Sequence, residues 1–371
     1  MTRNRVSTDR RTFLAGSAAL GAAGLAGCTG LIGGEDDDQL IGQIGSGREG
    51  RPEPGGTPMA ELPDLEGELT VYSGRGEFLV GELLDHIEGL YDDFEANIDP
   101  GGSSDLVNQI LTEGEGTHAD VFYTVDSGAL GTLADEGRTQ SLSSDTLDMI
   151  DEETFYTDDW VGTSGRARTI PYNTDALSES DMPDSIDAYA DFDGQLGWAP
   201  EYGSFQGFVT SMRILEGDEA TREWLEGIID SGVAYYGNEM AVAEAVNDGE
   251  LDAGFTNHYY IQRVIEGSSD PSIATNFTAG DAGATFDVAG ATVIDQADDP
   301  ELAENFIKHL LSSEAQEFFA VETFEYPTIE GVEPVGDLPT LEELDVPDVD
   351  PTQLSNVDET IELMREAGVD I

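Results

Sequence analysis

Positive charge and cysteine are almost absent from this chain. Its 371 residues include 15 Lys and Arg against 78 Asp and Glu, which gives a formal net charge of −63, and Lys308 is the only lysine. A surface of this sign repels nucleic acid and disfavours a nucleic-acid-binding function. Cys28 is the only cysteine, so an internal disulfide is excluded, and thiolate ligands for soft metals are lacking.

The acidic residues are spread over the whole length of the chain rather than gathered in one tail. Such a surface repels itself in dilute buffer, and at molar salt the Debye length falls to about 3 Å, which screens the repulsion. We therefore expect a salt-loving host. Intrinsic disorder is disfavoured, because apolar residues remain plentiful and periodic after residue 67.

No apolar run is long enough for a permanent transmembrane helix, and the run at 15–26 is followed by a cleavage-like motif. Arg10-Arg11-Thr12-Phe13-Leu14 precedes the run and matches a twin-arginine export signal. Leu25-Ala26-Gly27-Cys28 ends it and matches a lipoprotein cleavage site. Residues 1–28 are thus predicted to be a twin-arginine lipoprotein signal, with Cys28 as the lipid anchor at the outer face of the cytoplasmic membrane. The alternative is a basic N-terminus that arose by chance.

Residues 29–66 are rich in Gly, Pro and Asp and show no periodic apolar face, which predicts a flexible acidic tether. Short apolar strands and amphipathic helices alternate from there on. Strands are predicted near 69–72, 120–123, 168–172, 196–200 and 251–255, and one helix is expected to carry apolar residues from Leu83 to Phe94. This alternation predicts an α/β fold whose sites lie at the ends of strands, with two such units facing each other across a cleft.

Three tyrosines follow predicted strands. Tyr259 and Tyr260 lie just past the strand at 251–255, and Tyr202 lies just before a helix that Ser204 is expected to cap. A tyrosine pair alone is usually packing, and Tyr235-Tyr236, in a strand-like stretch, is interpreted that way. Three phenols from two loops would instead form a hard, anionic oxygen site that suits a small, highly charged cation.

Several segments resemble, in the same order, the ferric-iron-binding proteins of ABC importers. These segments are Thr70-Val71-Tyr72-Ser73-Gly74-Arg75, Ala119-Asp120-Val121-Phe122-Tyr123, Ser164-Gly165-Arg166-Ala167-Arg168, Gly203-Ser204-Phe205-Gln206, Asn257-His258-Tyr259-Tyr260 and a closing stretch from Ser355 to Gly368. The resemblance covers roughly residues 67–371. It implies a type II periplasmic-binding-protein (venus-flytrap) fold whose hinge strands join lobes at 67–170 plus 289–326 and 171–288 plus 327–371. It also implies Fe(III) as the cargo and an ABC permease as the partner.

Transferring the family's ligands residue by residue gives a partial match. The tyrosine pair corresponds to Tyr259 and Tyr260, and Tyr202 matches a third tyrosine that some members use. Gly76 and Val125 stand where other members have a histidine and a glutamate, so Glu77 and Asp126, one residue away, are candidate substitutes. Three phenolates would balance the charge of Fe(III).

The resemblance further implies a small anion, such as carbonate, beside the iron, held by Arg166 or Arg168. The helix N-terminus at Ser204 could donate amide hydrogens to this anion. The N-terminus at Ser103 and Ser104 could do so too, although simple helix capping is the favoured interpretation of those two serines.

No enzyme constellation stands out. His86, His118, His258 and His309 show no metal-ligand spacing, and His86 and His309 are expected to be solvated on helices. Asn276-Phe277-Thr278 matches a glycosylation sequon. The leading hypothesis is a monomeric, non-enzymatic iron receptor. The same fold could instead bind a phosphonate, thiamine or another small solute, and a tethered hydrolase or a structural envelope protein are more distant alternatives.

Overall fold

Strands and helices alternate along the computed structural model, which describes residues 44, 50–150, 153–355 and 357–371. The strands are β1 Gly67–Ser73, β2 Phe94–Pro100, β3 Val121–Thr124, β4 Thr139–Gln140, β5 Val161–Asn173, β6 Leu196–Trp198, β7 Ala234–Tyr235, β8 Ala253–Gly254, β9 Thr256–Asn257, β10 Ile273–Asn276 and β11 Phe286–Ile294. The α-helices are α1 Glu77–Leu90, α2 Ser103–Glu113, α3 Ser127–Asp135, α4 Ser144–Leu147, α5 Gly203–Glu216, α6 Asp218–Asp230, α7 Glu239–Asn247, α8 His258–Gly267, α9 Pro300–Leu310, α10 Ser313–Phe318 and α11 Asp358–Glu366.

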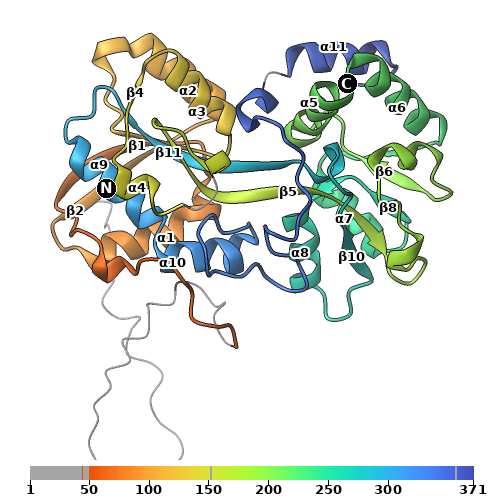
Figure 1. Ribbon diagram of the computed structural model, residues 1–371, viewed down its shortest axis with the longest axis horizontal. Helices are drawn as coiled ribbons and strands as arrows, with labels where there is room; N and C mark the ends of the chain where they lie inside the picture. The colour runs from red at the N-terminus through yellow and green to blue at the C-terminus, as the bar shows by residue number, and fades with distance from the viewer. Residues whose placement is uncertain (1–43, 45–49, 151–152, 356) are drawn as a thin grey trace, which may run out of the picture. The chain divides into compact units, whose positions relative to one another are not determined.

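Strand β5 belongs to two groups of strands. Neighbouring strands follow the order β2-β1-β3-β11-β5-β8-β6-β7. The first half of β5 pairs antiparallel with β11, while its second half pairs with β8, β9 and β10. Figure 1 shows β5 and β11 running side by side between the helices around β1 and those around β6. The two long strands therefore connect two α/β units, as the sequence predicts.

Each unit has its own hydrophobic core. In the first, β1 lies between parallel neighbours β2 and β3, and Leu69 and Val71 pack with Leu83 of α1 and Phe306 of α9. The second core is rich in aromatic side chains, namely Trp198, Phe205, Phe208, Trp224 and Phe255. Burying strands on both faces explains why they read as apolar runs rather than as alternating patterns.

Two glycines permit the close approach of β5 and β11. A Cβ atom on Gly165 would lie 2.0 Å from Cζ of Phe286, and one on Gly290 would lie 2.4 Å from the carbonyl oxygen of Val161. The register of the pair shifts between Ala289 and Gly290, which marks an irregularity in the ladder. A side chain at either position would push the two strands apart.

A segment late in the chain, around residues 319–326, contacts β5 again. A short π-helix at Phe319–Thr323 leads into Phe324, the one non-glycine residue with positive φ (60°) in the described ranges. Tyr326 then pairs with Gly165 of β5. Further on, the 3-10 helix Pro351–Ser355 contacts both α3 and α5, and α11 packs on α5 and α6.

Two sequence-based boundaries differ from the structure. Helix α1 ends at Leu90, and Phe94 begins the edge strand β2, so the predicted helix was too long. Met59 and Leu65, within the predicted tether, are buried. The amide N–H of Gly55 donates to Gly331 O at 2.7 Å, and that of Met59 donates to Glu314 Oε2 at 2.9 Å. Residues 51–66 thus pack on the fold instead of forming a free tether.

The predicted export signal at 1–28, with Cys28, and the tether residues 29–43 and 45–49 lie outside the described residues. The predicted lobe boundaries at 170, 288 and 326 stay a prediction. Among the helices that the structure describes, none combines the length and the apolar character that crossing a bilayer requires.

Candidate metal centre

The three predicted cation ligands come from the first turns of two helices. Tyr202 is the N-cap residue of α5, and Tyr259 and Tyr260 are the second and third residues of α8. The hydroxyl oxygens of Tyr202 and Tyr260 lie 2.7 Å apart and share a hydrogen bond. The ring centroids of Tyr259 and Tyr260 are 4.4 Å apart. The fold therefore gathers the three side chains in one place.

The local sequence explains how the tyrosine pair is oriented. Strand β9 ends at Asn257, the N-cap of α8, so the pair lies in a helix rather than in the turn that the sequence suggested. Tyr260 shares the buried face of α8 with Ile261 and Val264, while Tyr259, about 100° around the helix, is half-buried. The Arg263 guanidinium, one turn later, lies over both phenol rings, 5.1 and 5.7 Å from their centroids.

Burial raises the pKa of both Tyr259 and Tyr260. For Tyr259, the Arg166 guanidinium and hydrogen bonds with Tyr260 and Asn257 partly oppose this rise in pKa. Asn257 Nδ2 donates to the Tyr259 hydroxyl oxygen at 3.3 Å. The interactions of Tyr260 with Tyr259 and Tyr202 instead raise its pKa further. Both phenols are therefore protonated at neutral pH until a cation displaces the protons, and Tyr259 is the easier of the two to ionise.

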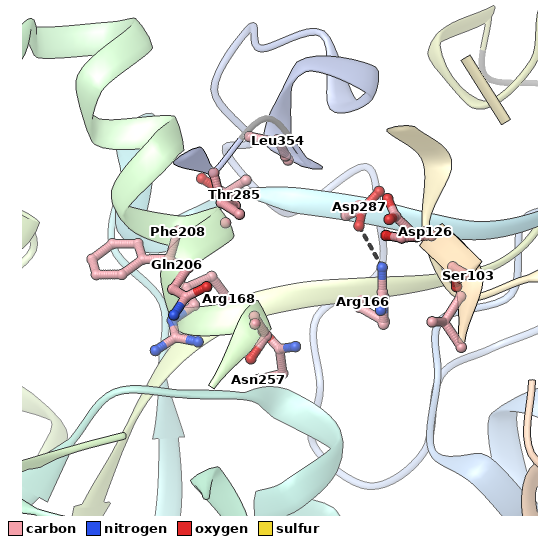
Figure 2. A pocket seen from close by; sticks show the side chains of 16 residues that line it. Ser103, Asp126, Arg166, Arg168, Gln206, Phe208, Asn257, Thr285, Asp287 and Leu354 are labelled. Atoms are coloured by element: carbon pink, nitrogen blue, oxygen red, sulfur yellow. Dashed lines mark hydrogen bonds and ion pairs between the residues drawn. The ribbon is translucent and has the colours of Figure 1, made fainter. Parts of the chain in front are cut away.

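A pocket of about 360 Å³ adjoins these tyrosines and contains all three predicted anion-binding residues. Its lining includes Arg166, Arg168 and Ser204, together with Gly203, the chain neighbour of Tyr202, and Asn257, which bonds to Tyr259. Figure 2 shows Arg166 facing Asp287 and Asp126, with Arg168 and Asn257 farther along the pocket. Strand β5 supplies both arginines, which explains why residues two apart line one pocket.

Each of the two arginines has a carboxylate partner. Arg166 forms an ion pair with Asp287 of β11, which also accepts a hydrogen bond from Ser127 Oγ at 2.5 Å. Arg168 forms an ion pair with Glu239, whose other oxygen accepts from the Asn257 amide at 3.0 Å. Burial raises the pKa of Asp287 above its usual range although Arg166 opposes the rise. The guanidinium charges are thus balanced by carboxylates of the protein.

Several buried donors in the pocket still have no hydrogen-bond partner among the described residues. They are Arg166 Nε, Arg168 Nε and Nη2, and Ser204 Oγ. An unsatisfied buried donor is unfavourable by about 1–3 kcal/mol. An anion with several acceptor oxygens would relieve this imbalance, so the chemistry of the pocket suits a small oxyanion.

The predicted serine caps are wrong. Tyr202 is the N-cap of α5, and Ser204 lies inside the helix with a buried hydroxyl that has no hydrogen-bond partner among the described residues. Gly102 is the N-cap of α2, and Ser103 Oγ accepts a hydrogen bond from Thr124 Oγ1 at 2.7 Å instead. These serines are therefore not accounted for by helix capping.

The two substitute carboxylates lie in different places. Asp126 lines the pocket with Arg166 and caps α3 by accepting from the Gly128 amide at 3.0 Å. Glu77 is exposed at the start of α1 and lines another pocket, with Arg75 and Glu82. Within the described ranges, no group of three or more His, Cys, Asp or Glu is arranged to hold a metal ion. The fold thus brings Asp126, but not Glu77, to the pocket that adjoins the tyrosines.

Sequence reasoning missed three polar partners in this region, namely Asn257, Asp287 and Glu239. Asn257 stood inside a quoted motif, and its place before the tyrosine pair was the one available signal. Glu239 lies 71 residues from Arg168 along the chain, and Asp287 lies 121 residues from Arg166. Nothing in the chain order links residues so far apart.

His309 and the tyrosine pair Tyr235-Tyr236 lie outside the site. His309, expected to be solvated, is 0% exposed, and its ring nitrogens contact Tyr91 Oη at 2.7 Å and Asn305 O at 2.8 Å. The expectation was wrong because His309 lies on the inner face of α9. Tyr236 packs on the same apolar cluster as Tyr202 and Tyr259, as its strand-like context suggested, whereas Tyr235 is 46% exposed.

Comparison with known proteins gives consistent matches. The family model described as "Bacterial extracellular solute-binding protein" matches residues 82–344. The major ferric iron-binding protein of Neisseria meningitidis serogroup A is 32% identical over 216 residues, which cover 57% of this chain and 65% of the relative. The Fe(3+)-binding periplasmic protein of Serratia marcescens is 32% identical over 218 residues, 57% of this chain and 63% of the relative. The chain thus spans a little under two thirds of these relatives.

Solved structures match over more of the chain. Iron-bound HitA of Pseudomonas aeruginosa has a TM-score of 0.72 and 29% identity, with 81% of this chain and 99% of that chain covered. A Trichodesmium protein solved with iron and citrate ligands has a TM-score of 0.71 and 26% identity, with 82% and 100% covered. These matches confirm the predicted two-lobed, type II periplasmic-binding-protein fold and the resemblance to ferric-iron-binding proteins.

Proposed function

We propose that this chain, which belongs to the family of bacterial extracellular solute-binding proteins, captures Fe(III) through the phenolate oxygens of Tyr202, Tyr259 and Tyr260. The ion is its cargo, which it delivers to the permease of an ABC importer. The chain acts as a binding receptor and not as an enzyme. The names of its relatives, which refer to ferric iron, support this cargo.

The observation that carries the proposal is the 2.7 Å separation of the Tyr202 and Tyr260 hydroxyl oxygens, which come from different helices. Oxygen ligands held at about 2.0 Å around a small octahedral cation lie about 2.8 Å apart at neighbouring positions. Replacing the shared proton by a cation therefore needs little movement of these two oxygens. Tyr259, on the same helical turn as Tyr260, would supply the third anionic ligand.

We further propose that a small oxyanion such as carbonate completes the coordination from the adjoining pocket, held by Arg166, Arg168 and Ser204. The unpartnered donors of these three residues support this assignment. Asp126 is the remaining candidate oxygen ligand, because it lines the same pocket, and the position of Glu77 favours it less.

The cellular setting that we propose follows from the N-terminal sequence. Export through the twin-arginine route and lipid attachment at Cys28 would hold a monomeric receptor at the outer face of the cytoplasmic membrane, near its permease. A salt-loving host fits the net charge of −63.

One further candidate keeps the fold and changes the cargo to a small organic anion such as a phosphonate. The two arginines and the unpartnered Ser204 hydroxyl favour this alternative, because they suit an oxyanion with or without a metal. Calorimetry in high salt separates the two: heat on adding a ferric chelate supports iron, and heat on adding a phosphonate to metal-free protein supports the organic anion.

The direct test is a visible absorption band from phenolate-to-iron charge transfer on adding ferric citrate in high salt. We expect wild-type protein to show the band and Tyr259→Phe to lose it or to lose most of its intensity. Tyr236→Phe is the matched control, because this tyrosine packs on the same cluster, and it should keep the band. Equal spectra from both variants and wild type would refute the tyrosine assignment.

A further inference from the structure

His258, the residue before the tyrosine pair, is fully buried and hydrogen-bonded through both ring nitrogens. Its exposed fraction is 0%. The amide N–H of Ala167 donates to Nδ1 at 3.1 Å, and Nε2 lies 2.7 Å from the carbonyl oxygen of Phe324. Because a carbonyl oxygen only accepts, Nε2 carries a proton. Nδ1 lies 3.1 Å from the Ala167 amide nitrogen and 3.3 Å from the Ala167 carbonyl oxygen, and we assign it as the acceptor of the shorter, amide contact.

The two partners of His258 belong to the segments that connect the two α/β units. Ala167 lies within β5 and pairs with Phe286 of β11. Phe324 is the residue with positive φ, and it is followed by Glu325, which forms a buried ion pair with Arg75 at the end of β1. His258 therefore connects the start of α8 to β5 and to the segment 323–326. The same segment is also bonded to the first unit, through the ion pair of Glu325 with Arg75.

The His258 ring is also fixed by its aromatic neighbours. Its centroid lies 4.7 Å from that of Tyr326 and 5.7 Å from that of Tyr259. His258 is the first residue of α8, so its position sets how the first turn of the helix is rotated. That rotation decides where the hydroxyl groups of the next two residues lie.

We propose that His258 is a positioning residue for the iron site. Held as the Nε2–H tautomer between Ala167 N–H and Phe324 O, it sets the rotation of the first turn of α8 and so keeps the Tyr260 hydroxyl within reach of Tyr202. This inference rests on the proposed function for its consequence in iron binding, and its geometric part can be tested without metal.

Three substitutions separate the contributions of the aromatic ring, the Nδ1 acceptor and the Nε2–H donor of His258. His258→Phe keeps an aromatic ring and removes both hydrogen bonds. His258→Asn keeps an acceptor near the Ala167 amide, and His258→Gln keeps a donor that can reach Phe324 O. His309→Phe is the matched control, because His309 is also 0% exposed and bonded through both nitrogens, but lies on α9 against Tyr91.

The measurements are the charge-transfer band of the iron-loaded full chain and the rate at which excess chelator removes the iron. We expect His258→Phe to shift the band maximum and to speed iron loss by about tenfold or more, as is usual when a ligand's supporting partner is removed. His258→Asn and His258→Gln should fall between this variant and wild type. His309→Phe should lower the thermal unfolding midpoint but leave both iron readouts unchanged.

The proposal would be overturned if folded His258→Phe kept the wild-type band maximum and lost iron at a rate within twofold of wild type. It would also be overturned if His309→Phe changed both readouts as much as His258→Phe does. If His258→Phe does not fold, the same criterion applies to His258→Asn and His258→Gln. If wild type itself shows no band, the proposed function fails, and crystal structures of the metal-free variants then test the positioning role. Loss of the hydrogen bond between Tyr202 and Tyr260 is expected, and its retention would contradict the role.

Discussion

Three arginines on or beside β5 have carboxylate partners: Arg75 with Glu325, Arg166 with Asp287 and Arg168 with Glu239. The first and third pairs are buried, whereas the side chains of Arg166 and Asp287 are 16% and 22% exposed. In a chain with 78 acidic residues, carboxylate partners for arginines are plentiful. Burying an ion pair is unfavourable unless hydrogen bonds offset the desolvation of both charges. Arg75 Nη2 lies 2.5 Å from Glu325 Oε2, and Ser164 and Thr323 donate to the same carboxylate. The remaining lone pairs are thus satisfied, which a buried ion pair requires.

Removing one partner of this pair tests its contribution to stability. We expect Glu325→Gln to lower the free energy of unfolding at pH 7 by about 3–5 kcal/mol, because Arg75 is left buried without a counter-charge. Glu366→Gln is the control, since Glu366 pairs with Arg222 at the surface and is 57% exposed, and exposed pairs contribute about 0–1 kcal/mol. Urea denaturation in high salt measures both variants.

The pH dependence of this difference has a definite sign. Burial raises the pKa of Glu325, but the Arg75 charge and hydrogen bonds outweigh burial, so the folded pKa lies below the usual 4.5. The stabilisation is therefore fully present above pH 4.5 and is lost as the pH falls through the lower folded value. The gap between wild type and Glu325→Gln should shrink on acidification, and a gap that widens would contradict the ion-pair interpretation.

The sequence singled out three tyrosines that the structure places together, but it did not indicate the polar partners of the two arginines. Tyr202, Tyr259 and Tyr260 could be singled out because each follows a predicted strand, where sites of α/β folds lie. Asp287 and Glu239 could not, because they are two among 78 acids and become partners only through tertiary pairing. The sequence also gave no indication that Arg166 Nε and Arg168 Nε and Nη2 would lack hydrogen-bond partners among the described residues.

At the scale of elements, the connection between the units depends on how closely β5 and β11 approach. Gly165 faces the Phe286 ring, and no β-carbon fits between them. Since β5 also carries Arg166, Arg168 and the Ala167 amide that His258 accepts from, any shift of this strand moves the site.

A glycine substitution tests this packing. We expect Gly165→Ala to destabilise the fold by about 1–3 kcal/mol, because the new methyl group overlaps a buried ring. Gly89→Ala is the control: nothing lies within 4 Å of a Cβ at this exposed position of α1, so the variant should gain about 0.5–1 kcal/mol. Thermal unfolding measures both, and a neutral Gly165→Ala would show that the strands can separate freely.

Element type was more predictable than element length. The strands near 69–72, 120–123 and 168–172 correspond to β1, β3 and β5 because continuous apolar runs mark buried strands. Phe94 was assigned to the helix because its spacing continued the apolar face, although pairing with β1 places it in an edge strand. Likewise, residues 51–66 look like a linker by composition and pack only because α10 and the segment around Gly331 lie beside them.

For the whole molecule, charge dominates the behaviour in solution. A formal net charge of −63 on 371 residues implies strong self-repulsion wherever salt does not screen it. Salt screens the repulsion between the exposed acidic side chains, whereas it affects the buried ion pairs much less.

Salt should therefore stabilise the protein. We expect the thermal unfolding midpoint to rise as KCl increases from about 0.1 M to about 1 M, where the Debye length falls from about 10 Å to about 3 Å. Sucrose at equal osmolality is the control for non-ionic effects and should raise the midpoint less. A midpoint that is insensitive to KCl would argue against a fold adapted to high salt.

The proposed iron site requires three phenolic oxygens to meet around one Fe(III) ion. The most direct measurement is anomalous diffraction at the iron absorption edge from crystals of the iron-loaded protein. We predict one strong anomalous peak within bonding distance of the hydroxyl oxygens of Tyr202, Tyr259 and Tyr260, beside the pocket lined by Arg166 and Ser204. A peak bound only by carboxylates away from these tyrosines, or no peak at all, would contradict the account.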